Sequence, residues 1–291
     1  MPNDVALSRQ RWLVAVGFFM QTLDSTIVNT ALPSMARSLG ESPLRMQSVV
    51  VAYTLTMAAL IPASGWIADR FGLRNTFLAA IALFTLGSIA CAASPTLQVL
   101  VASRVLQGLG GAMLLPVGRL SLLRTCPRHR LLEPMSFVAI PGLIGPLIGP
   151  TLGGWLTEAA SWHWIFLINV PVGILSLMLV EAMVDEPPLI VEERRRRWAR
   201  GVHFDFPGAA LIALAVGSLE VMLDRGVQDD WFASPVIRGA ALIAGACLVA
   251  FVLWELIERD PLLDMSLFKY RSFASATFII MTIGVILFGT T

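Results

Sequence analysis

The chain has 291 residues, of which 56% are hydrophobic and only 14% are charged, and its mean hydropathy is +0.74. Soluble domains carry about 25% charged residues, so this composition excludes an ordinary soluble domain and predicts a membrane protein. The 21 basic and 20 acidic residues nearly cancel, which leaves no strong overall field to attract nucleic acid. Cys91, Cys126 and Cys247 have neither metal-site nor disulfide spacing, and we expect them to be packing residues.

Apolar segments of about 20 residues, the length that an α-helix needs to cross a bilayer, recur nine times along the chain. They lie near residues 12–33, 45–68, 74–94, 98–121, 132–157, 162–183, 206–223, 236–256 and 273–290. The sequence therefore predicts an all-α polytopic membrane protein with about nine transmembrane helices. A secretory signal peptide is the alternative for the first segment, but no small-residue cleavage site follows it and the apolar run is too long.

The first predicted helix contains a carboxylate near its middle, Asp24. A charged side chain at the centre of a membrane helix costs at least about 2.5 to 3.5 kcal/mol on insertion scales, so it indicates a function. We expect Asp24 to bind a proton or a cationic group.

A short loop, GWIADRFGLRN, joins the second and third predicted helices. Gly65 and Gly72 allow a tight turn. Asp69 lies at a helix end, where Arg70 and Arg74 can pair with it or with helix-end carbonyl groups. We expect this loop to hold the helices in one conformational state, and an ordinary solvated turn is the alternative.

The fourth predicted helix contains an intramembrane arginine. Arg104, Gln107, Gly108 and Gly111 share one helix face, and the two glycines leave room for a neighbouring helix. Because arginine does not readily lose its proton, Arg104 is expected to shift the pKa of a nearby acid or to hold an anion, with snorkelling to the interface as the alternative.

The fifth predicted helix combines a glycine repeat with several prolines. Gly145, Gly149 and Gly153 recur every four residues, a pattern that lets two helices approach closely. Prolines bend helices, so we expect this helix to be a moving element, and a static packing seam is the alternative. The three prolines are Pro141, Pro146 and Pro150.

Basic residues predict the orientation, because Lys and Arg accumulate in cytoplasmic loops. With a cytoplasmic N-terminus, the inner side holds sixteen of them: Arg9, Arg11, Arg70, Arg74, Arg119, Arg124, Arg128, Arg130, Arg194 to Arg197, Arg200, Arg259, Lys269 and Arg271. The outer side holds only Arg37, Arg45, Arg225 and Arg238, and Arg104 lies within a helix. The charged stretch 184–205 is therefore predicted to be a cytoplasmic linker.

Other chemistries find no support in the sequence. No Walker-type glycine–lysine loop is present for ATP, and the three histidines do not cluster with acids or cysteines as a metal or catalytic site would require. We therefore expect no enzyme activity, no metal site and no cofactor. Glu220, near the outer end of the seventh helix, is expected to face lipid headgroups rather than a cationic substrate.

Four motifs together resemble those of the major facilitator superfamily. Residues 65–74 resemble its loop between helices two and three, with Ile67 and Leu73 as departures. Residues 104–111 resemble its fourth-helix motif, and residues 145–154, which include Pro150 and Gly154, resemble its antiporter motif. The segment LDSTIVNTALP, which includes Asn29, resembles the first helix of the fourteen-helix drug:proton antiporters of the EmrB/QacA type.

This resemblance implies proton-driven export of lipophilic, often cationic, compounds by alternating access in the bacterial inner membrane. It assigns proton coupling to Asp24 and Arg104, gating to residues 65–74, and the conformational change to the antiporter helix. Asn29, Gln107, Gly108 and Gly111 are the candidate substrate-pocket residues. The energy source is the proton gradient.

The resemblance also implies a domain organisation. Residues 1–183 form a six-helix transporter half, 184–205 the linker, 206–256 two inserted helices, and 257–291 the start of the second half. A fourteen-helix antiporter would continue beyond Thr291, so we expect a fragment of a longer protein, a remnant with a truncated second half, or one half of an assembly in which a second subunit supplies the missing helices. A non-transporting remnant, scaffold or partner subunit is therefore the alternative function.

Overall fold

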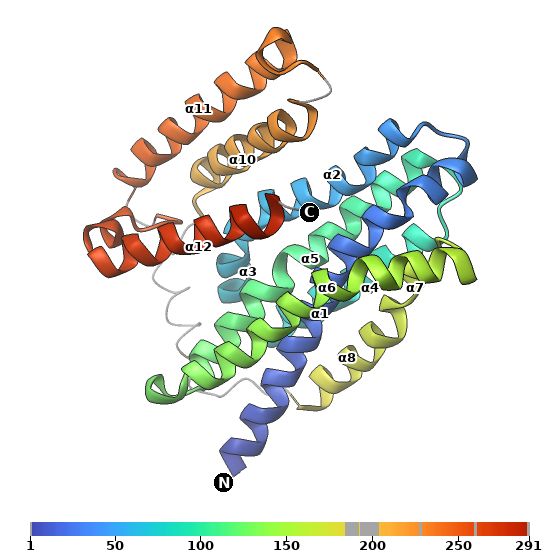
Figure 1. The fold of residues 1–291 in the computed structure, drawn as a ribbon. Coiled ribbons are helices and arrows are strands. Elements are labelled where there is room, and N and C mark those ends of the chain that lie inside the picture. The colour runs from blue at the N-terminus through green and yellow to red at the C-terminus, as the bar shows by residue number, and fades with distance from the viewer. Residues whose placement is uncertain (1, 184–191, 193–203, 227–228, 259–260, 290–291) are drawn as a thin grey trace.

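The computed structural model describes residues 2–183, 192, 204–226, 229–258 and 261–289. In this part of the chain all regular secondary structure is helical (Figure 1). The elements are α1 (Pro2–Leu39), α2 (Pro43–Leu60), η1 (Ile61–Ala63), α3 (Ser64–Phe71), α4 (Leu73–Ala92), α5 (Leu97–Thr125), η2 (Arg128–Arg130), α6 (Leu132–Ala159), α7 (Trp164–Leu167), α8 (Asn169–Met183), α10 (Phe206–Gly226), η3 (Trp231–Ala233), α11 (Pro235–Glu255), η4 (Met265–Lys269) and α12 (Arg271–Gly289).

Side-chain caps define where several of these helices begin. The hydroxyl groups of Ser42, Thr96 and Ser234 each accept a hydrogen bond from a backbone N–H in the first turn of α2, α5 and α11. Pro43 and Pro235 occupy the first helical position, where the missing N–H has no intrahelical partner to lose. These local signals fix the turns between neighbouring helices.

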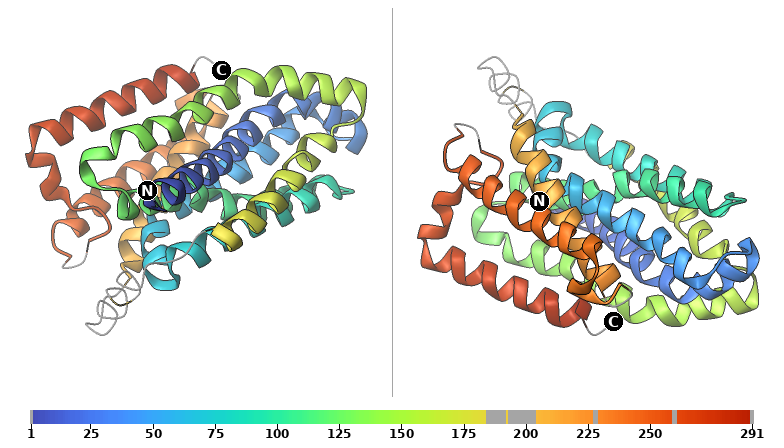
Figure 2. Two further views of the ribbon diagram at one scale, coloured as in Figure 1. Left: turned by 90° about the horizontal axis from the view of Figure 1, so that it is seen from below. Right: turned by 90° about the horizontal axis from the view of Figure 1, so that it is seen from above.

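Helix α1 is the centre of the first half of the chain. It contacts α2, α5, α6, α7 and α8, and its contact with α6 is the most extensive. Figures 1 and 2 show α6 running beside α1, with the α10–α11 hairpin on the flank of the molecule next to α2. Helix α12 lies at the edge of the molecule, where it packs on η4, and its residues 271–283 are almost all exposed.

Seven helical segments of the described residues are long and apolar enough to cross a membrane: Pro43–Phe71, Leu73–Ala92, Leu97–Thr125, Leu132–Ala159, Trp164–Ala182, Phe206–Gly226 and Pro235–Glu255. They match seven of the nine predicted spans. The first predicted span lies within α1, which has 38 residues and, at 1.5 Å per residue, a length of about 57 Å. The ninth lies in α12, where Arg271–Ile283 form a shorter apolar helix. The chain is a multi-pass membrane protein.

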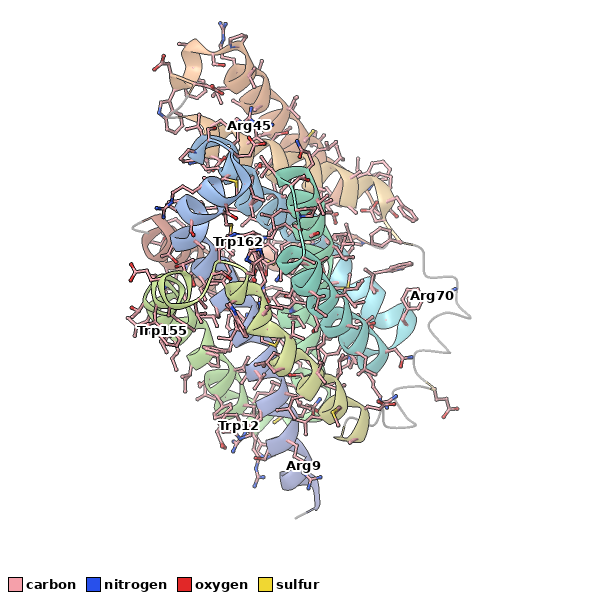
Figure 3. All side chains as sticks on the ribbon, turned by 90° about the vertical axis from the view of Figure 1, so that its right-hand side faces the viewer. Arg9, Trp12, Arg45, Arg70, Trp155 and Trp162 are labelled. Atoms are coloured by element: carbon pink, nitrogen blue, oxygen red, sulfur yellow. The ribbon has the colours of Figure 1, made fainter. Side chains whose placement is uncertain are left out.

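Two arginines that are predicted to lie on opposite sides of the membrane are well separated along the helical bundle. Figure 3 shows Arg9 near one end and Arg45 toward the other, and the orientation in the membrane stays a prediction. At the Arg9 end, Arg11 forms an ion pair with Glu133 at the start of α6, with 2.7 Å between nitrogen and oxygen. The linker 184–205 lies outside the described residues except for residues 192, 204 and 205.

Candidate functional site: a buried ionic centre between helices

Asp24 of α1 and Arg104 of α5 form an ion pair at the core of the bundle. The distance from Arg104 Nη1 to Asp24 Oδ2 is 2.5 Å, and both side chains are 0% exposed. The residues that the sequence marked separately in the first and fourth predicted helices are therefore direct partners. The snorkelling alternative for Arg104 is wrong, because its guanidinium points into the protein and not toward the membrane surface.

Two amide side chains complete the polar contacts of Asp24. Gln107 Nε2 donates to Asp24 Oδ1 at 2.8 Å, and Asn169 Nδ2, from the start of α8, donates to the same oxygen at 3.2 Å. The Gln107 amide also donates to Ser88 Oγ of α4 at 2.8 Å, while its oxygen accepts from Arg104 Nη1 at 2.7 Å. Side chains of α5 and α8 thus meet the α1 carboxylate directly, and α4 joins this centre through the bond between Ser88 and Gln107.

The guanidinium of Arg104 has a further set of contacts on its other edge. Its Nε donates to the backbone carbonyl of Val49 in α2 at 3.2 Å. The ring of Tyr53 lies 4.1 Å from the guanidinium carbon, and the ring of Phe166 lies 5.7 Å away, both within the range of a cation–π contact. Among the described residues, Arg104 Nη2 and the Tyr53 hydroxyl have no hydrogen-bond partner.

The stability of this arrangement depends on whether Asp24 is charged or protonated. A buried ion pair recovers its desolvation cost only while both charges are present, and removing one partner typically costs about 3–5 kcal/mol. If Asp24 gains a proton, the charge on Arg104 remains with only neutral partners, Gln107 Oε1 and the Val49 carbonyl. Binding of one proton at Asp24 therefore favours any conformation that gives Arg104 a new partner.

The four candidate pocket residues lie in two different environments. Asn29 is exposed, whereas Gln107 is completely buried in the ionic centre. Gly108 and Gly111 face α2, where an added Cβ would lie 2.9 Å from Thr56 Cβ and from the Tyr53 hydroxyl, respectively. The two glycines therefore allow close packing of α5 on α2, as their spacing predicted.

The inner loop has a conformation different from that expected. Gly72 has φ 91° and ψ 151°, a backbone conformation that side-chain-bearing residues rarely adopt, and it separates α3 from α4. Gly65 is exposed and lies within helix α3, so the turn expected there does not form. The turn depends on Gly72.

The charged residues of this loop reach other helices. Asp69 Oδ1 accepts from Arg124 Nη2 of α5 at 2.5 Å. Arg74 Nη2 donates to the carbonyl of Glu181, near the end of α8, at 3.0 Å, which is the helix-end contact predicted as one of its alternatives. Arg70 lies at the exposed side of the loop (Figure 3). The loop thus joins α3 and α4 to α5 and α8.

Helix α6, the predicted antiporter helix, meets α1 through a regular series of contacts. Gly145, Gly149 and Gly153 are buried, and a Cβ added at any of them would collide with a threonine hydroxyl of α1. The threonines are Thr22, Thr26 and Thr30, in the same order. The glycines and the threonines are both spaced four residues apart, so each turn of α6 contacts the corresponding turn of α1. Pro150 is exposed, and a Cβ at Gly154 would meet nothing within 4 Å.

The three prolines do not divide α6 into separate helices. Residues Leu132–Ala159 form one continuous helix, because each proline removes a single backbone hydrogen bond and the flanking residues retain theirs. The threonine hydroxyls of α1 also approach α6 carbonyl oxygens, at 3.4 Å for Pro141 and 3.5 Å for Gly145. Polar contact therefore accompanies the close packing.

Sequence reasoning missed three residues that complete these sites. Asn169 and Ser88 belong to the ionic centre, and Arg124 is the partner of Asp69. A lone asparagine or serine in an apolar helix gives little signal by itself. Arg124 was counted only as a basic residue of the inner side. Its position in the last turn of α5 was the available indication that it lies near the inner loop.

The fold and the buried ion pair define a class: a polytopic helical membrane protein with a charged centre shared by several helices. The sequence profile described as the Major Facilitator Superfamily matches residues 14–291. The chain therefore belongs to the major facilitator superfamily.

Curated relatives are similar over most of this chain. The "Putative multidrug resistance protein MdtD" of Salmonella typhimurium (strain LT2) is 50% identical over 265 residues, which cover 91% of this chain and 54% of that protein. The protein of the same name from Cronobacter sakazakii is 50% identical over 270 residues, or 92% and 55%. The chain spans about half the length of these relatives.

Solved structures agree with the fold. A peptide transporter POT in complex with sulfate aligns with a TM-score of 0.58 at 16% identity, covering 87% of this chain and 53% of that chain. The proton:xylose symporter XylE aligns with a TM-score of 0.56 at 18% identity, covering 77% and 54%. At these identities the likeness shows a shared transporter fold.

Proposed function

We propose that the protein acts in proton-coupled export of lipophilic, often cationic, small molecules by alternating access. The observation that supports this most directly is the completely buried ion pair between Asp24 and Arg104. The names of the curated relatives, which describe multidrug resistance proteins, support export of drugs as the transport task. The fourteen-helix EmrB/QacA type remains part of this proposal.

In the proposed cycle, Asp24 is the proton-binding group. Arg104, Gln107 and Asn169 stabilise the carboxylate with three hydrogen bonds. Protonation removes the charge that compensates Arg104, and the resulting cost of an unpaired buried charge drives rearrangement of α1 against α5. Release of the proton on the other side of the membrane restores the pair. Substrate and proton movements are coupled because both depend on this rearrangement.

Two other elements have proposed roles in the same cycle. The loop of Gly65, Asp69, Arg70, Gly72 and Arg74 acts as the inner gate, supported by the contacts from Asp69 to α5 and from Arg74 to α8. The α6 segment with Gly145, Gly149, Pro150, Gly153 and Gly154 provides a surface on which α6 moves along α1. The close packing of the α6 glycines on α1 supports that motion.

We propose that the protein lies in the bacterial inner membrane with its N-terminus in the cytoplasm. The distribution of sixteen basic residues on one side and four on the other supports this orientation. The domain division at residues 183, 205 and 256 is part of the same proposal. The packing of α10 and α11 as a hairpin beside α2 supports treating them as an inserted pair.

The alternative is a membrane scaffold or partner subunit that moves no substrate. The family match and the names of the curated relatives favour export over this alternative. The two functions differ in what they require of Asp24, because a scaffold needs the packing of α1 but not a titrating carboxylate.

The test compares proton movement in two variants of the protein purified from its native membrane, after its intact mass has been measured. In proteoliposomes, Asp24→Asn should abolish drug-stimulated proton release while the protein remains in the membrane. Glu158→Gln, which changes an exposed carboxylate at the far end of α6, should retain it. Drug-stimulated proton release that persists in Asp24→Asn would contradict the proposal, and its absence from the wild type would favour the scaffold.

A further inference from the structure

A second pair of buried carboxyl groups lies at one end of the α10–α11 hairpin. Asp205 immediately precedes α10, and Glu255 is the last residue of α11. The two residues are 7% and 3% exposed, and oxygen atoms of both side chains lie beside Gly208. Nothing in the transport cycle proposed above uses either residue.

One oxygen of each carboxyl group accepts hydrogen bonds from the protein. Asp205 Oδ1 accepts from the backbone N–H of Gly208 at 2.9 Å and from Trp254 Nε1 at 2.8 Å. Glu255 Oε2 accepts from the backbone N–H of Leu263 at 3.0 Å. These contacts fix both side chains, and they join the start of α10, the end of α11 and the segment that precedes η4.

The other oxygen of each group has no protein donor among the described residues. Asp205 Oδ2 and Glu255 Oε1 are both buried and unpartnered. They face the same space above Gly208, where an added Cβ would collide with Asp205 Oδ2 and would lie 2.8 Å from Glu255 Oε1. The glycine therefore leaves room for both carboxyl oxygens in one space.

Two acids in this position cannot both be charged without compensation, because like charges at close range in a buried site repel strongly. Within the described residues no Lys, Arg or His side chain forms an ion pair with either group. Arg259, four residues beyond the end of α11, lies outside the described residues. A hydrogen ion between the free oxygens satisfies both, since a protonated carboxyl donates and a carboxylate accepts.

We propose that Asp205 and Glu255 bind one shared proton, forming a protonation site distinct from Asp24. This inference does not depend on the transport function, because it follows from the geometry of the pair alone.

Aromatic contacts connect the segment that contains Asp205 to α3, which forms part of the inner loop region. Phe204 packs against Trp66 of α3, with ring centroids 4.7 Å apart, and against Phe206 of α10 at the same separation. Asp205 lies between these two phenylalanines in the chain. The position of the acid pair is therefore tied to α3, the helix that also contains Asp69. Gain or loss of the shared proton changes the anchoring of α3 to the hairpin.

Infrared difference spectroscopy on the full chain in lipid nanodiscs tests the proposal, because a protonated carboxyl group has a carbonyl stretch that a carboxylate lacks. The wild type should show such a band at neutral pH. Both Asp205→Asn and Glu255→Gln should lose it, since either amide donates to the remaining carboxylate and replaces the shared proton. Glu158→Gln, at an exposed position, should keep it. Loss of the band in only one of the two pair variants would contradict a shared proton.

A variant that keeps both acids tests the proposal even if Asp205→Asn and Glu255→Gln fail to fold. Trp254→Phe removes one hydrogen bond to Asp205 and leaves the two carboxyl groups in place. The band should persist in this variant but shift in frequency, and an unshifted band would assign it to another residue. Absence of the band from the wild type, together with an increase in thermal stability on adding sodium or magnesium chloride alone, would show that the pair binds a cation and would overturn the proposal.

Discussion

Among the described residues, the aspartate–arginine pairs Asp24–Arg104 and Asp69–Arg124 have the same nitrogen–oxygen distance and different surroundings. Asp24 and Arg104 are 2.5 Å apart and 0% exposed, and Asp69 and Arg124 are also 2.5 Å apart but 36% and 29% exposed. One pair joins α1 to α5 in the middle of the bundle. The other joins α3 to the end of α5 at the surface.

This difference shows that the distance between two charges does not determine what the pair contributes. At the surface, water screens the attraction, and exposed pairs are worth about 0–1 kcal/mol. In the core, each charge needs the other, so breaking the pair costs several kcal/mol even where the intact pair adds little net stability. The buried pair suits proton coupling, and the exposed pair suits a contact that opens and closes at low cost.

The largest effect should follow removal of one member of the buried pair. Arg104→Gln leaves the Asp24 carboxylate buried without its counter-charge, and we expect a loss of about 3–5 kcal/mol in unfolding free energy. Chemical unfolding in detergent micelles measures this change. The double variant Asp24→Asn with Arg104→Gln should recover a large part of the loss, because no charge remains buried. A double variant as unstable as the single one would show that packing, not charge, controls this site.

The next effect concerns α6, which holds α1 on another side from the ionic centre. Gly149→Ala places a Cβ against Thr26 Oγ1, and overpacking of this kind costs about 1–3 kcal/mol. Gly154→Ala is the matched control in the same helix, since a Cβ there meets nothing within 4 Å. Thermal unfolding should separate the two variants, and Thr26→Ala should partly rescue Gly149→Ala. Equal stabilities would mean that the α1–α6 interface is loose.

The sequence predicted the main features of the buried site because charge in an apolar helix is a strong signal. Asp24 and Arg104 were identified in this way, and the four-residue glycine repeat correctly indicated close packing of α6. Asn169 was not predicted, since its role depends on the start of α8 reaching α1, and no local pattern encodes that long-range contact. The pairing of Asp69 with Arg124 was missed for the same reason: 55 residues separate them along the chain.

A smaller effect on stability should distinguish Gly65 from Gly72. Both glycines were predicted from the sequence to have the same role in a tight turn. Gly72→Ala forces a residue with a Cβ into φ 91°, and such strained conformations cost about 1–3 kcal/mol. Gly65→Ala lies within α3 with open space around it, so better helix propensity should stabilise the protein by up to about 1 kcal/mol. Circular dichroism melting curves of the two variants should move in opposite directions. A destabilised Gly65→Ala would indicate that another segment occupies the space beside it.

The smallest effect on stability should come from the exposed pair. Asp69→Asn removes its charge where water reaches both partners, and we expect a loss of no more than about 1 kcal/mol, measured by the same unfolding assay as Arg104→Gln. The two variants thus compare one ionic contact in two environments. A double-mutant cycle with Arg124→Gln isolates the coupling between Asp69 and Arg124, and raised salt should weaken it. A coupling as large as that of the buried pair would mean that the inner loop excludes water more fully than the exposure of its side chains indicates, and the contrast between the two sites would then fail.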